Sequence, residues 1–548
     1  MPTLEEYKKI ADLLYPNINK TIADYLKIYP ERNLPQGAEV TRFAPSPTGY
    51  MHIGGVYQCL VDRQIAKTSG GIMILRNEDT DSKREVEGAA NIFVPALKKF
   101  GIEFDEGFVQ ENLPDKGAYG PYTQSKRKEI YQAFAKELVS KGLAYPCFCS
   151  EADEESKKEQ LRLGVPTGYY GRWAKCRNLS YEQVKAHIDN GDKFTIRIKS
   201  NGDGNKKFKF KDLRMGETLL PVNSNDYVLL KSDGLAVYHM AHLVDDTLMH
   251  TTTVVRDESW FPSVPLHVQL FEYCGLMAPK YFHTATINTI DAETGNARKV
   301  SKRKDSWADA RFFHEKGYPA EAVVDYLMNI INSNFEDWRA KNPDASVLEF
   351  GFNPEKMSKS GAMFDLAKLD NISKNIISRM SGEKLFTRAL AWAEEYNPDY
   401  AKLLKANEKF AKEVFDMDKN PLRPRKDITT YSELPDFYSY MFDGNFERVF
   451  DEKYDSKFVK QVLNSYAKAY TAGVTKEEWF DGMKAVAEAN GFATDNKLYK
   501  ANPEAYKGNM ADFSCLVRVA VTGRRQTPDL YAILALLGKD EVISRLSK

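Results

Sequence analysis

The sequence predicts an α/β domain built on a parallel sheet, with an α+β insertion and a mainly α-helical C-terminal region. Residues 39–75 follow a strand–loop–helix–strand pattern, and a second β-branched run ends at Arg256 before an amphipathic helix. Helical periodicity then takes over from about residue 375. At 548 residues the chain is too long for one hydrophobic core, so we expect about three to five domains.

The composition is that of an ordinary globular protein, with 43% hydrophobic and 28% charged residues. Lys plus Arg and Asp plus Glu number 77 each, and this zero net charge neither favours nor excludes a nucleic-acid partner. The six cysteines are too widely spread for a disulfide framework. No apolar run approaches the roughly 20 residues that cross a bilayer, and the N-terminus lacks the core of a signal peptide. We therefore expect a cytoplasmic protein without membrane contact.

The stretch "EVTRFAPSPTGYMHIGG" opens the first predicted unit. "EVTRFA" favours a strand that stops at the Pro-Ser-Pro-Thr-Gly loop, a helical pattern opens at Gly54 and Gly55, and "GGIMIL" is typical of a buried strand. Ligands of such folds bind at the carboxyl ends of strands, beside helix N-termini that attract anions. The loop and His52 are therefore placed where a phosphate group would bind.

Several kinds of polar side chain converge on this edge of the predicted sheet. A cation, hydroxyls and an imidazole surround the first strand end, and a carboxylate cluster follows the next: Arg42, Ser46, Thr48, His52, Glu78, Asp79 and Asp81. A surface histidine beside a glycine-initiated helix would also explain His52 taken alone. The convergence favours a functional site instead.

"RFAPSPTGYMHIGG" and "LRNEDTD" resemble the first signature and the acidic motif of bacterial glutamyl-tRNA synthetases, which are class I enzymes. Glutaminyl enzymes and the archaeal and eukaryotic glutamyl enzymes have a Pro-Glu-Pro loop instead. The resemblance runs with gaps from about residue 38 to the C-terminus; Asn77 departs from it, because the family commonly has Ile there. It implies a Rossmann-type catalytic domain, an inserted connective domain and a helical anticodon-binding region.

The resemblance also implies a reaction and its partners. Glutamate and ATP, accompanied by Mg²⁺, would form glutamyl-adenylate, and the glutamyl group would move to the 3′ end of tRNA(Glu), releasing AMP and diphosphate. In this family the first step usually requires bound tRNA. We expect a monomer, and the sequence leaves open whether tRNA(Gln) is also charged. Two alternatives remain: a nucleotidyltransferase acting on a small molecule, and a tRNA carrier without catalysis.

By position, the resemblance assigns the glutamate pocket to Arg42, Ala44, Ser46, Glu78, Tyr238 and Arg256. Arg42 and Arg256 would face the side-chain carboxylate, and Glu78 would bind the ammonium group. Four places after Tyr238 the family often has Asn, but this chain has His242. An ordinary salt bridge at a strand end is the alternative role for Arg256.

Two lysine motifs are candidates for the segment that stabilises the leaving pyrophosphate. "RKVSKRK" (298–304) places five cations in a predicted loop, whereas "EKMSKSG" (355–361) matches the class I signature literally but follows a long helical pattern that would carry it away from the sheet. The family has Lys-x-Ser-Lys-Arg at the earlier position, so we take the later copy as a tRNA-contacting segment. The resemblance then gives catalytic roles to His52, Lys299 and Lys302. It gives ATP contacts to Thr48, Gly49, His52, Gly54, Gly55, Ser301 and Lys302.

The predicted insertion contains three cysteines close in sequence, Cys147, Cys149 and Cys176. They offer three thiolates to zinc, which prefers four tetrahedral ligands, and Tyr170 offers a weak fourth. Many relatives have the last cysteine where Trp173 stands. A zinc site and buried free thiols both remain open.

The C-terminal third predicts helices with clear ends. "VTKEEWFDGMKAVAEANG" has a capping box from Thr475 to Glu478, and in "TPDLYAILALLG" we expect Thr527 as the cap with Pro528 at the first helical position. Basic residues there are candidates for phosphate contacts or for a solvated charged face: Arg423, Arg425, Lys426, Arg518, Arg524 and Arg525. The predicted domains are a helical extension (1–38), the two Rossmann halves (39–118 and 232–296), the connective domain (119–231), the lysine loop with a stem-contact domain (297–374) and the anticodon-binding domain (375–548).

Overall fold

The computed structural model describes residues 2–81, 85–149, 154–301, 303–357, 362–417, 419 and 424–548. The chain forms two compact units. The first comprises Met1–Phe312 and Val324–Asp365, and the second comprises Phe313–Val323 and Leu366–Lys548. The finer division into six domains stays a prediction.

The first unit is built on parallel strands in the order β10-β9-β1-β2-β3. One ladder joins β1 (Val40–Phe43), β2 (Ile72–Leu75) and β3 (Glu106–Gly107), and a second joins β9 (Thr253–Asp257) to β10 (Lys280–Thr284). The N–H of Thr252 donates to the carbonyl of Val40 at 2.9 Å and so places β9 beside β1. The strand order reverses between β1 and β9, which is where ligands of doubly wound folds bind. The predicted α/β fold class is confirmed.

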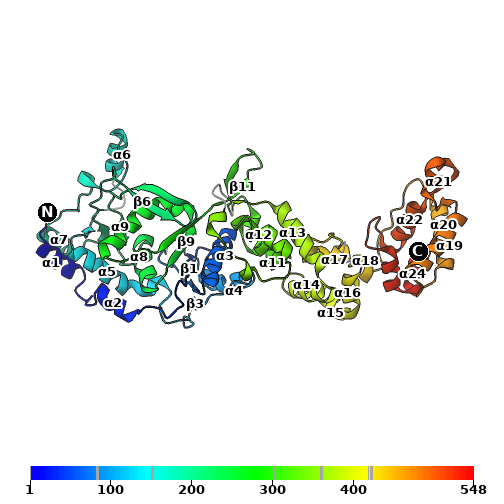
Figure 1. Cartoon of the computed structure of the whole chain (residues 1–548), viewed down its shortest axis with the longest axis horizontal. Helices are drawn as coiled ribbons and strands as arrows, with labels where there is room; N and C mark the ends of the chain where they lie inside the picture. Colours follow the sequence, from blue (N-terminus) through cyan, green and yellow to red (C-terminus); the bar gives the residue numbers. More distant parts are fainter. Residues whose placement is uncertain are drawn as a thin grey trace. The chain divides into compact units, whose positions relative to one another are not determined.

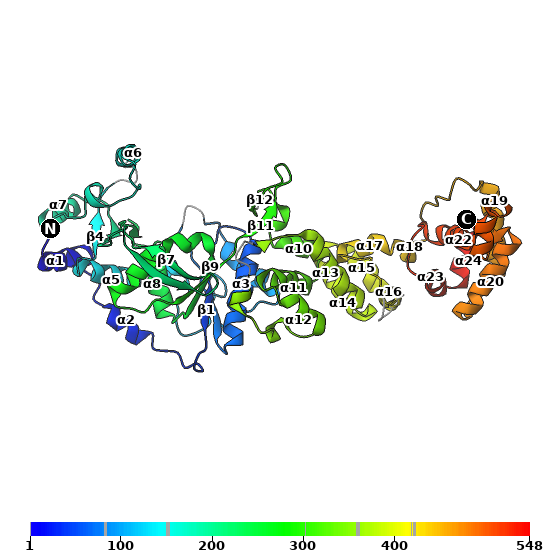
Figure 2. The same cartoon turned by 45° about the horizontal axis from the view of Figure 1, so that its top comes forward.

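Helix α3 (Ile53–Thr68) follows β1 and packs against the sheet (Figures 1 and 2). Its apolar stripe of Val56, Leu60, Val61 and Ile65 is buried. The helix begins one residue earlier than predicted, because His52 caps it. Gly55 allows the close approach of the preceding loop, since a Cβ there would lie 2.7 Å from the sulfur of Met51. The other helices beside this sheet are α4 (Phe93–Lys98), α8 (Tyr238–Leu248) and α9 (Val264–Cys274).

The insertion is an α+β structure, as predicted. Strands β4 (Ala144–Cys147), β5 (Thr195–Ile198) and β8 (Val228–Leu230) form an antiparallel sheet, and β6 (Lys207–Asp212) pairs with β7 (Gly216–Pro221) as a hairpin. Its helices are α5 (Lys128–Ser140), α6 (Glu154–Arg162) and α7 (Tyr181–Asp189). Helix α6 projects away from the rest of the insertion in Figure 1.

The N-terminal extension is two helices, α1 (Leu4–Leu14) and α2 (Ile22–Ile28), rather than one. Each begins with a capping box, from Thr3 and Thr21 respectively, and both lie against α5 in Figure 1. Their buried residues belong to the same hydrophobic cluster as α5 and α8. The extension is therefore part of the core of the first unit.

A small sheet follows the parallel one. Strand β11 (Ile287–Ile290) forms a hairpin with β12 (Ala297–Lys299) and also pairs in parallel with β13 (Ala362–Met363). Between them run α10 (Arg311–Glu315), α11 (Ala320–Ile331) and α12 (Phe335–Lys341). This sheet joins two segments that are far apart in sequence. Strand β11 precedes "RKVSKRK" and β12 overlaps its start, whereas β13 follows "EKMSKSG".

The second unit is mainly helical, as predicted, with two short strands, β14 (Phe492–Ala493) and β15 (Gly508–Asn509). Its helices from Leu366 onward are α13 (Leu366–Arg379), α14 (Gly382–Tyr396), α15 (Pro398–Ala406), α16 (Glu408–Asp416), α17 (Leu434–Phe437), α18 (Ser439–Phe442), α19 (Ser456–Ala469), α20 (Lys476–Ala489), α21 (Asn496–Ala501), α22 (Met510–Thr522), α23 (Leu530–Leu537) and α24 (Lys539–Ser547). Among the described residues, no helix combines the length and apolar character that a membrane span needs.

Candidate active site

The predicted glutamate pocket and His52 meet at the carboxyl ends of β1, β2 and β9. Arg42 lies in β1, Glu78 follows β2, and Arg256 lies in β9. Tyr238 is the first residue of α8, and His52 is the N-cap of α3, so two helix N-termini face the same edge. This arrangement concentrates cations and free backbone N–H groups where an anionic substrate would bind.

The loop after β1 carries the other predicted residues. Ala44 is half-buried, and Ser46 and Thr48 are exposed. The N–H of Glu78 donates to the carbonyl of Pro45 at 3.0 Å, which ties the loop to the end of β2. Gly49 has φ +118°, a backbone conformation that favours glycine.

His52 has a definite hydrogen-bonding state. Its Nδ1 accepts the N–H of Gly54 at 2.9 Å. Because Nδ1 is an acceptor, a neutral ring carries its proton on Nε2. The half-buried imidazole therefore carries its N–H on Nε2, beside the first turn of α3.

A buried ion network supports the first half of the site. Arg42 Nε donates to Asp246 Oδ1 at 3.0 Å, and Arg76 Nη1 donates to the same oxygen at 2.8 Å. Arg76 Nη2 also donates to Glu78 Oε1 at 3.0 Å. Neither Arg76 nor Asp246 was predicted from the sequence. The spacing of His242 and Asp246, four residues apart on one helix face, was the available signal.

The electrostatics of this network follow from burial and from the two guanidinium groups. Burial by itself would raise the pKa of Asp246, but Arg42 and Arg76 outweigh it and hold that pKa well below its usual range. Burial dominates at Glu78 and raises its pKa, although Arg76 acts in the opposite direction. Asp246 is therefore a firmly ionised anchor for both arginines.

Arg256 is surrounded by histidines. Its Nε donates to His283 Nε2 at 3.0 Å, and its Nη1 lies 3.0 Å from His267 Nδ1 and 3.3 Å from the Tyr238 hydroxyl. The Arg256 side chain is 3% exposed, and its Nη2 is buried without a hydrogen-bond partner among the described residues. No carboxylate of the described chain forms an ion pair with it. The salt-bridge alternative for Arg256 therefore finds no support.

His242, which stands where the family often has Asn, makes contacts of its own. Its Nδ1 contacts Asp246, its Nε2 lies 2.8 Å from the Tyr281 hydroxyl, and its ring stacks on Tyr238 at 5.9 Å between centroids. The imidazole is fully buried. Burial lowers its pKa to about 4, so the ring is neutral near pH 7.

The "RKVSKRK" segment and the chain just after it both contact the edge of the parallel sheet that carries His52 and Arg256. Lys299 Nζ lies 3.4 Å from Asp257 Oδ1 at the end of β9. On the other side, Asp309 forms an antiparallel β-bridge with His52, and the N–H of Ala310 donates to the carbonyl of Met51 at 2.9 Å. Lys302 itself lies outside the described residues.

Carboxylates balance much of the positive charge of this segment. Arg298 contacts Asp305 at 2.7 Å and Asp291 at 2.8 Å, and Lys304 lies 3.4 Å from Asp291. The N–H of Ser301 donates to Asp305 at 2.9 Å. These contacts brace the described residues of the segment, so Arg298 and Lys304 are less available to a ligand than their charges alone suggest.

The prediction that "EKMSKSG" is carried away from the parallel sheet stays a prediction, and the strand after the motif joins the small sheet instead. Residues 358–361 lie outside the described residues, but the strand that follows them, β13, pairs with β11. The N–H of Phe364 donates to the carbonyl of Asn288 at 2.8 Å. The chain returns after α12, so both lysine motifs adjoin the same small sheet. Their position beside this small sheet therefore does not distinguish them.

The three predicted cysteines come together in the insertion. The sulfurs of Cys147, Cys149 and Cys176 lie within 4.8 Å of one another. The hydroxyl of Tyr169 lies 3.3 Å from Cys147 Sγ and 3.2 Å from Cys149 Sγ. Tyr170, the expected fourth ligand, instead donates to the carbonyl of Pro166 at 2.6 Å, so that prediction was wrong. A hydrogen bond with Cys176 lowers the pKa of the Cys147 thiol to about 4.

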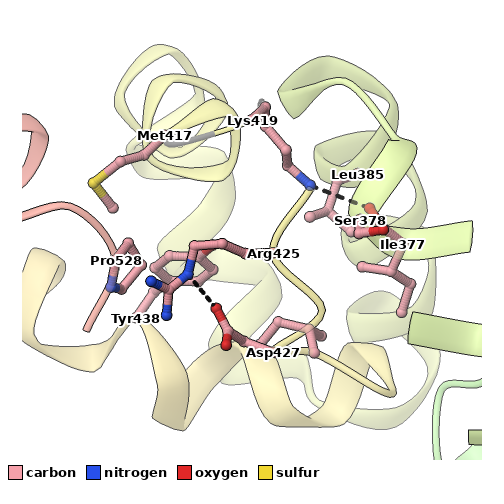
Figure 3. Close-up of a pocket in the computed structure, with 10 residues that line it drawn as sticks. Ile377, Ser378, Leu385, Met417, Lys419, Arg425, Asp427, Tyr438 and Pro528 are labelled. Carbon is pink, nitrogen blue, oxygen red and sulfur yellow. Dashed lines mark hydrogen bonds and ion pairs between the residues drawn. The ribbon is translucent and has the colours of Figure 1, made fainter. Parts of the chain in front are cut away.

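The second unit contains a small pocket beside predicted basic residues. Figure 3 shows Arg425 paired with Asp427 at 2.7 Å next to Tyr438, and Lys419 donating to the carbonyl of Ile377 at 3.1 Å. The cavity is about 30 Å³, which is room for a water molecule and not for a substrate. Arg423 lies outside the described residues.

Two other predicted basic residues have structural partners. Arg518 Nη1 donates to the carbonyl of Pro528 at 2.9 Å, and Arg524 Nη2 donates to the carbonyl of Asp436 at 2.7 Å. Arg525 lies 3.8 Å from Asp451 and is mostly exposed. Among these three, Arg525 has the freest side chain for a phosphate contact.

Comparison with known families gives two matches. Residues 39–371 match the family described as tRNA synthetases class I (E and Q), catalytic domain. Residues 390–548 match an anticodon binding domain. The two matches fall on the α/β part and the helical part of the chain respectively.

Individual relatives are similar over nearly the whole chain. The glutamate–tRNA ligase of Clostridium perfringens (strain SM101) is 45% identical and covers 99% of both chains. That of Acetivibrio thermocellus is 43% identical over 99% of this chain and 100% of the relative. A solved glutamate tRNA ligase from Elizabethkingia meningosepticum, in complex with its amino acid, is 25% identical with a TM-score of 0.74 over 93% of this chain and 98% of that chain.

Proposed function

Since the chain belongs to the glutamate–tRNA ligases, a family of class I tRNA synthetases, we propose that the site at the ends of β1, β2 and β9 catalyses that reaction. Glutamate and ATP form glutamyl-adenylate, and the glutamyl group then passes to the 3′ end of tRNA(Glu). AMP and diphosphate are released. A nucleotidyltransferase acting on a small molecule would have no use for residues 390–548, which match an anticodon binding domain.

The observation that carries this proposal is Arg256 Nη2, which has no hydrogen-bond partner among the described residues. A buried guanidinium nitrogen without an acceptor is costly unless a ligand supplies one. A carboxylate is the acceptor that a guanidinium fork suits best. In the proposed pocket, Arg42 and Arg256 bind the side-chain carboxylate of glutamate and Glu78 binds its ammonium group. Tyr238, Ala44 and Ser46 line the space between.

ATP would bind along the first turn of α3. The Nε2–H of His52 and the positive end of α3 would stabilise phosphate oxygens, where charge grows as pyrophosphate leaves. Gly54 and Gly55, whose N–H groups already donate to His52, would line the phosphates. Thr48 and Gly49 approach the nucleotide from the loop. Lys299, Ser301 and Lys302 complete the site from the other side. Mg²⁺ accompanies the ATP phosphates.

The tRNA would contact several parts of the chain. We assign the acceptor end to residues 119–231, the stem to 297–374 and the anticodon to 375–548. A single chain carries all three regions, which suits a monomer. Charging assays with purified tRNA(Glu) and tRNA(Gln) decide between single and dual tRNA specificity.

The cysteine cluster fits a structural zinc ion. Three sulfurs lie within 4.8 Å of one another, and the Tyr169 hydroxyl lies 3.3 and 3.2 Å from two of them; zinc binds thiolates well and prefers four tetrahedral ligands, so Tyr169 would be a weak fourth. Arg197 lies over the Tyr169 ring at 4.1 Å, and its charge helps to lower the pKa of the nearby Cys147 thiol, which favours the thiolate. When bound, zinc would crosslink β4 to the segment before α7. No step of the reaction passes through it.

The test of the proposed function is exchange of pyrophosphate into ATP. The assay contains glutamate, ATP and tRNA(Glu), and parallel reactions omit one component. We expect exchange that depends on glutamate and on tRNA, followed by glutamyl-tRNA formation. Exchange with glutamine in place of glutamate, or no acylated tRNA, would contradict the proposal.

A further inference from the structure

Arg256 imposes a hydrogen-bond pattern on the histidines around it. A guanidinium group only donates, so every ring nitrogen that it contacts must be an unprotonated acceptor. His267 contacts it through Nδ1 and His283 through Nε2. The protonation state of both rings follows from these two contacts and from the partners on their other sides.

The first chain runs through α9 to α8. Because His267 Nδ1 accepts from Arg256, the proton of the neutral ring is on Nε2, which lies 2.9 Å from His239 Nδ1. His239 Nδ1 must then accept as well. Both imidazoles are neutral with one tautomer each, and burial lowers the pKa of each ring.

The second chain runs from β10 to the inserted hairpin. Because His283 Nε2 accepts from Arg256, its proton is on Nδ1, which lies 2.7 Å from Asp212 Oδ2. The carboxylate of Asp212 also accepts the backbone N–H of His283 at 3.1 Å. The insertion thereby helps to fix the ring that holds Arg256.

Together these contacts leave one side of the guanidinium available. Nε is bonded to His283, and the two protons of Nη1 face His267 and the Tyr238 hydroxyl. All of these acceptors are uncharged, so none neutralises Arg256. Only Nη2 remains, buried and without a partner among the described residues. Arg256 thus carries a full positive charge and can bond to a ligand through Nη2.

We propose that His267 and His283 are positioning residues that hold Arg256 with neutral acceptors, so that its charge and its Nη2 select a carboxylate over an amide. This inference rests on the proposed function and names the source of its amino-acid specificity. His239 accepts the Nε2–H of His267, on the side of that ring away from Arg256. Glutamate gains an ion pair with Arg256, whereas glutamine places only a neutral carbonyl oxygen or an amide group there.

The test compares substitutions that keep or remove the acceptor. His267→Asn retains an acceptor near the position of Nδ1, and His283→Gln retains one near Nε2, whereas His267→Leu and His283→Leu remove it. His267→Asp instead installs a carboxylate beside Arg256. The readouts are KM for glutamate, KM for ATP and the preference for glutamate over glutamine in pyrophosphate exchange.

For each leucine variant we expect KM for glutamate to rise about 10- to 100-fold, as for a lost hydrogen bond to a charged group. KM for ATP should change little, and the Asn and Gln variants should recover most of the loss. His267→Asp should lose preference for glutamate over glutamine by at least about 10-fold. His187→Leu, on α7 and stacked on Phe148, controls for loss of a histidine elsewhere.

Equal effects of Asn and Leu at position 267 would overturn the inference, as would parallel changes in the two KM values. An unchanged glutamate preference in His267→Asp would do the same. If the leucine variants do not fold, the comparison of His267→Asn with His267→Asp, which have nearly the same shape, still decides. A wild-type chain that fails to activate glutamate would overturn the proposed function instead.

Discussion

Asp309 forms an antiparallel β-bridge with His52, although 257 positions separate them in the chain (309 minus 52). The bridge anchors the far flank of the "RKVSKRK" segment beside the first turn of α3. Lys299, on the near flank, lies 3.4 Å from Asp257 at the end of β9. The segment is thus attached on both sides to the edge that carries His52 and Arg256. The described residues on both sides of Lys302 therefore adjoin the proposed nucleotide site at α3.

The lysine motifs can be separated by mutation. We expect Lys302→Ala to lower the rate of glutamate activation by about 10²- to 10³-fold, as for one lost transition-state donor. Lys359→Ala should leave that rate nearly intact and weaken tRNA binding instead. Pyrophosphate exchange at saturating tRNA measures the first effect, and filter binding measures the second. The reverse pattern would make the literal signature the catalytic one.

Removing Asp246 should destabilise the catalytic unit strongly. Asp246→Ala leaves Arg42 and Arg76 without their shared carboxylate, and breaking a buried ion pair in this way costs about 3–5 kcal/mol. Hydrogen exchange of amides in α3 and α8 measures the local free energy of opening. Asp399→Ala, which removes an exposed partner of Lys402, is the matched control and should cost less than about 1 kcal/mol. Equal costs for the two variants would contradict the buried network.

The histidine cluster predicts a stability loss in mild acid. Burial lowers the pKa of His239 and of His242 to about 4, below the ordinary value of 6.5. The unfolded chain therefore binds more protons than the folded chain between these values, and stability falls as the pH drops from 6.5 toward 4. Each histidine contributes a slope of up to about 1.4 kcal/mol per pH unit.

Urea unfolding of the wild type and of His239→Asn across this pH range checks that expectation. The variant lacks one of the titrating rings, so its stability should depend less steeply on pH. Identical slopes for the two proteins would show that His239 is not held neutral in the folded state.

The cysteine cluster predicts one zinc ion per chain. Protein purified without chelators should contain zinc, and Cys176→Ala should lose most of it because three thiolates hold the ion far better than two. Tyr169→Phe should weaken binding less. Cys274→Ala removes a half-buried cysteine outside the cluster and should retain zinc. Elemental analysis of the four proteins is the measurement; a zinc-free wild type would favour buried free thiols.

Local sequence signals predicted much of the fold. The alternation of buried strands with a glycine-initiated helix located β1, α3 and β2, and the capping box from Thr475 to Glu478 begins α20 as expected. The predicted N-cap of α23 was wrong. Asp529, not Thr527, accepts the N–H of Ala532, whereas the Thr527 hydroxyl accepts from Arg518 Nη1 and donates to the carbonyl of Pro528. Two candidate caps two residues apart cannot be ranked without knowing what each contacts.

The site was predictable only in part. Arg42, Glu78, Tyr238 and Arg256 were assigned through the family resemblance, and the structure brings them to one edge of the sheet. The histidines around Arg256 could not be predicted, because His239, His267 and His283 come from α8, α9 and β10 and share no sequence spacing. The choice of Tyr169 over Tyr170 also depends on which neighbour turns inward, and residue type does not reveal that.

The most direct test of the site is steady-state pyrophosphate exchange in His52→Ala and Arg256→Lys. We expect His52→Ala to lower kcat by about 10²- to 10³-fold with KM for glutamate nearly unchanged, since its N–H acts on developing phosphate charge. Arg256→Lys, which cannot bond to His283, His267 and the substrate together, should instead raise KM for glutamate by about 10- to 100-fold. Indistinguishable effects of the two variants on kcat and KM, or full activity in either, would contradict the account.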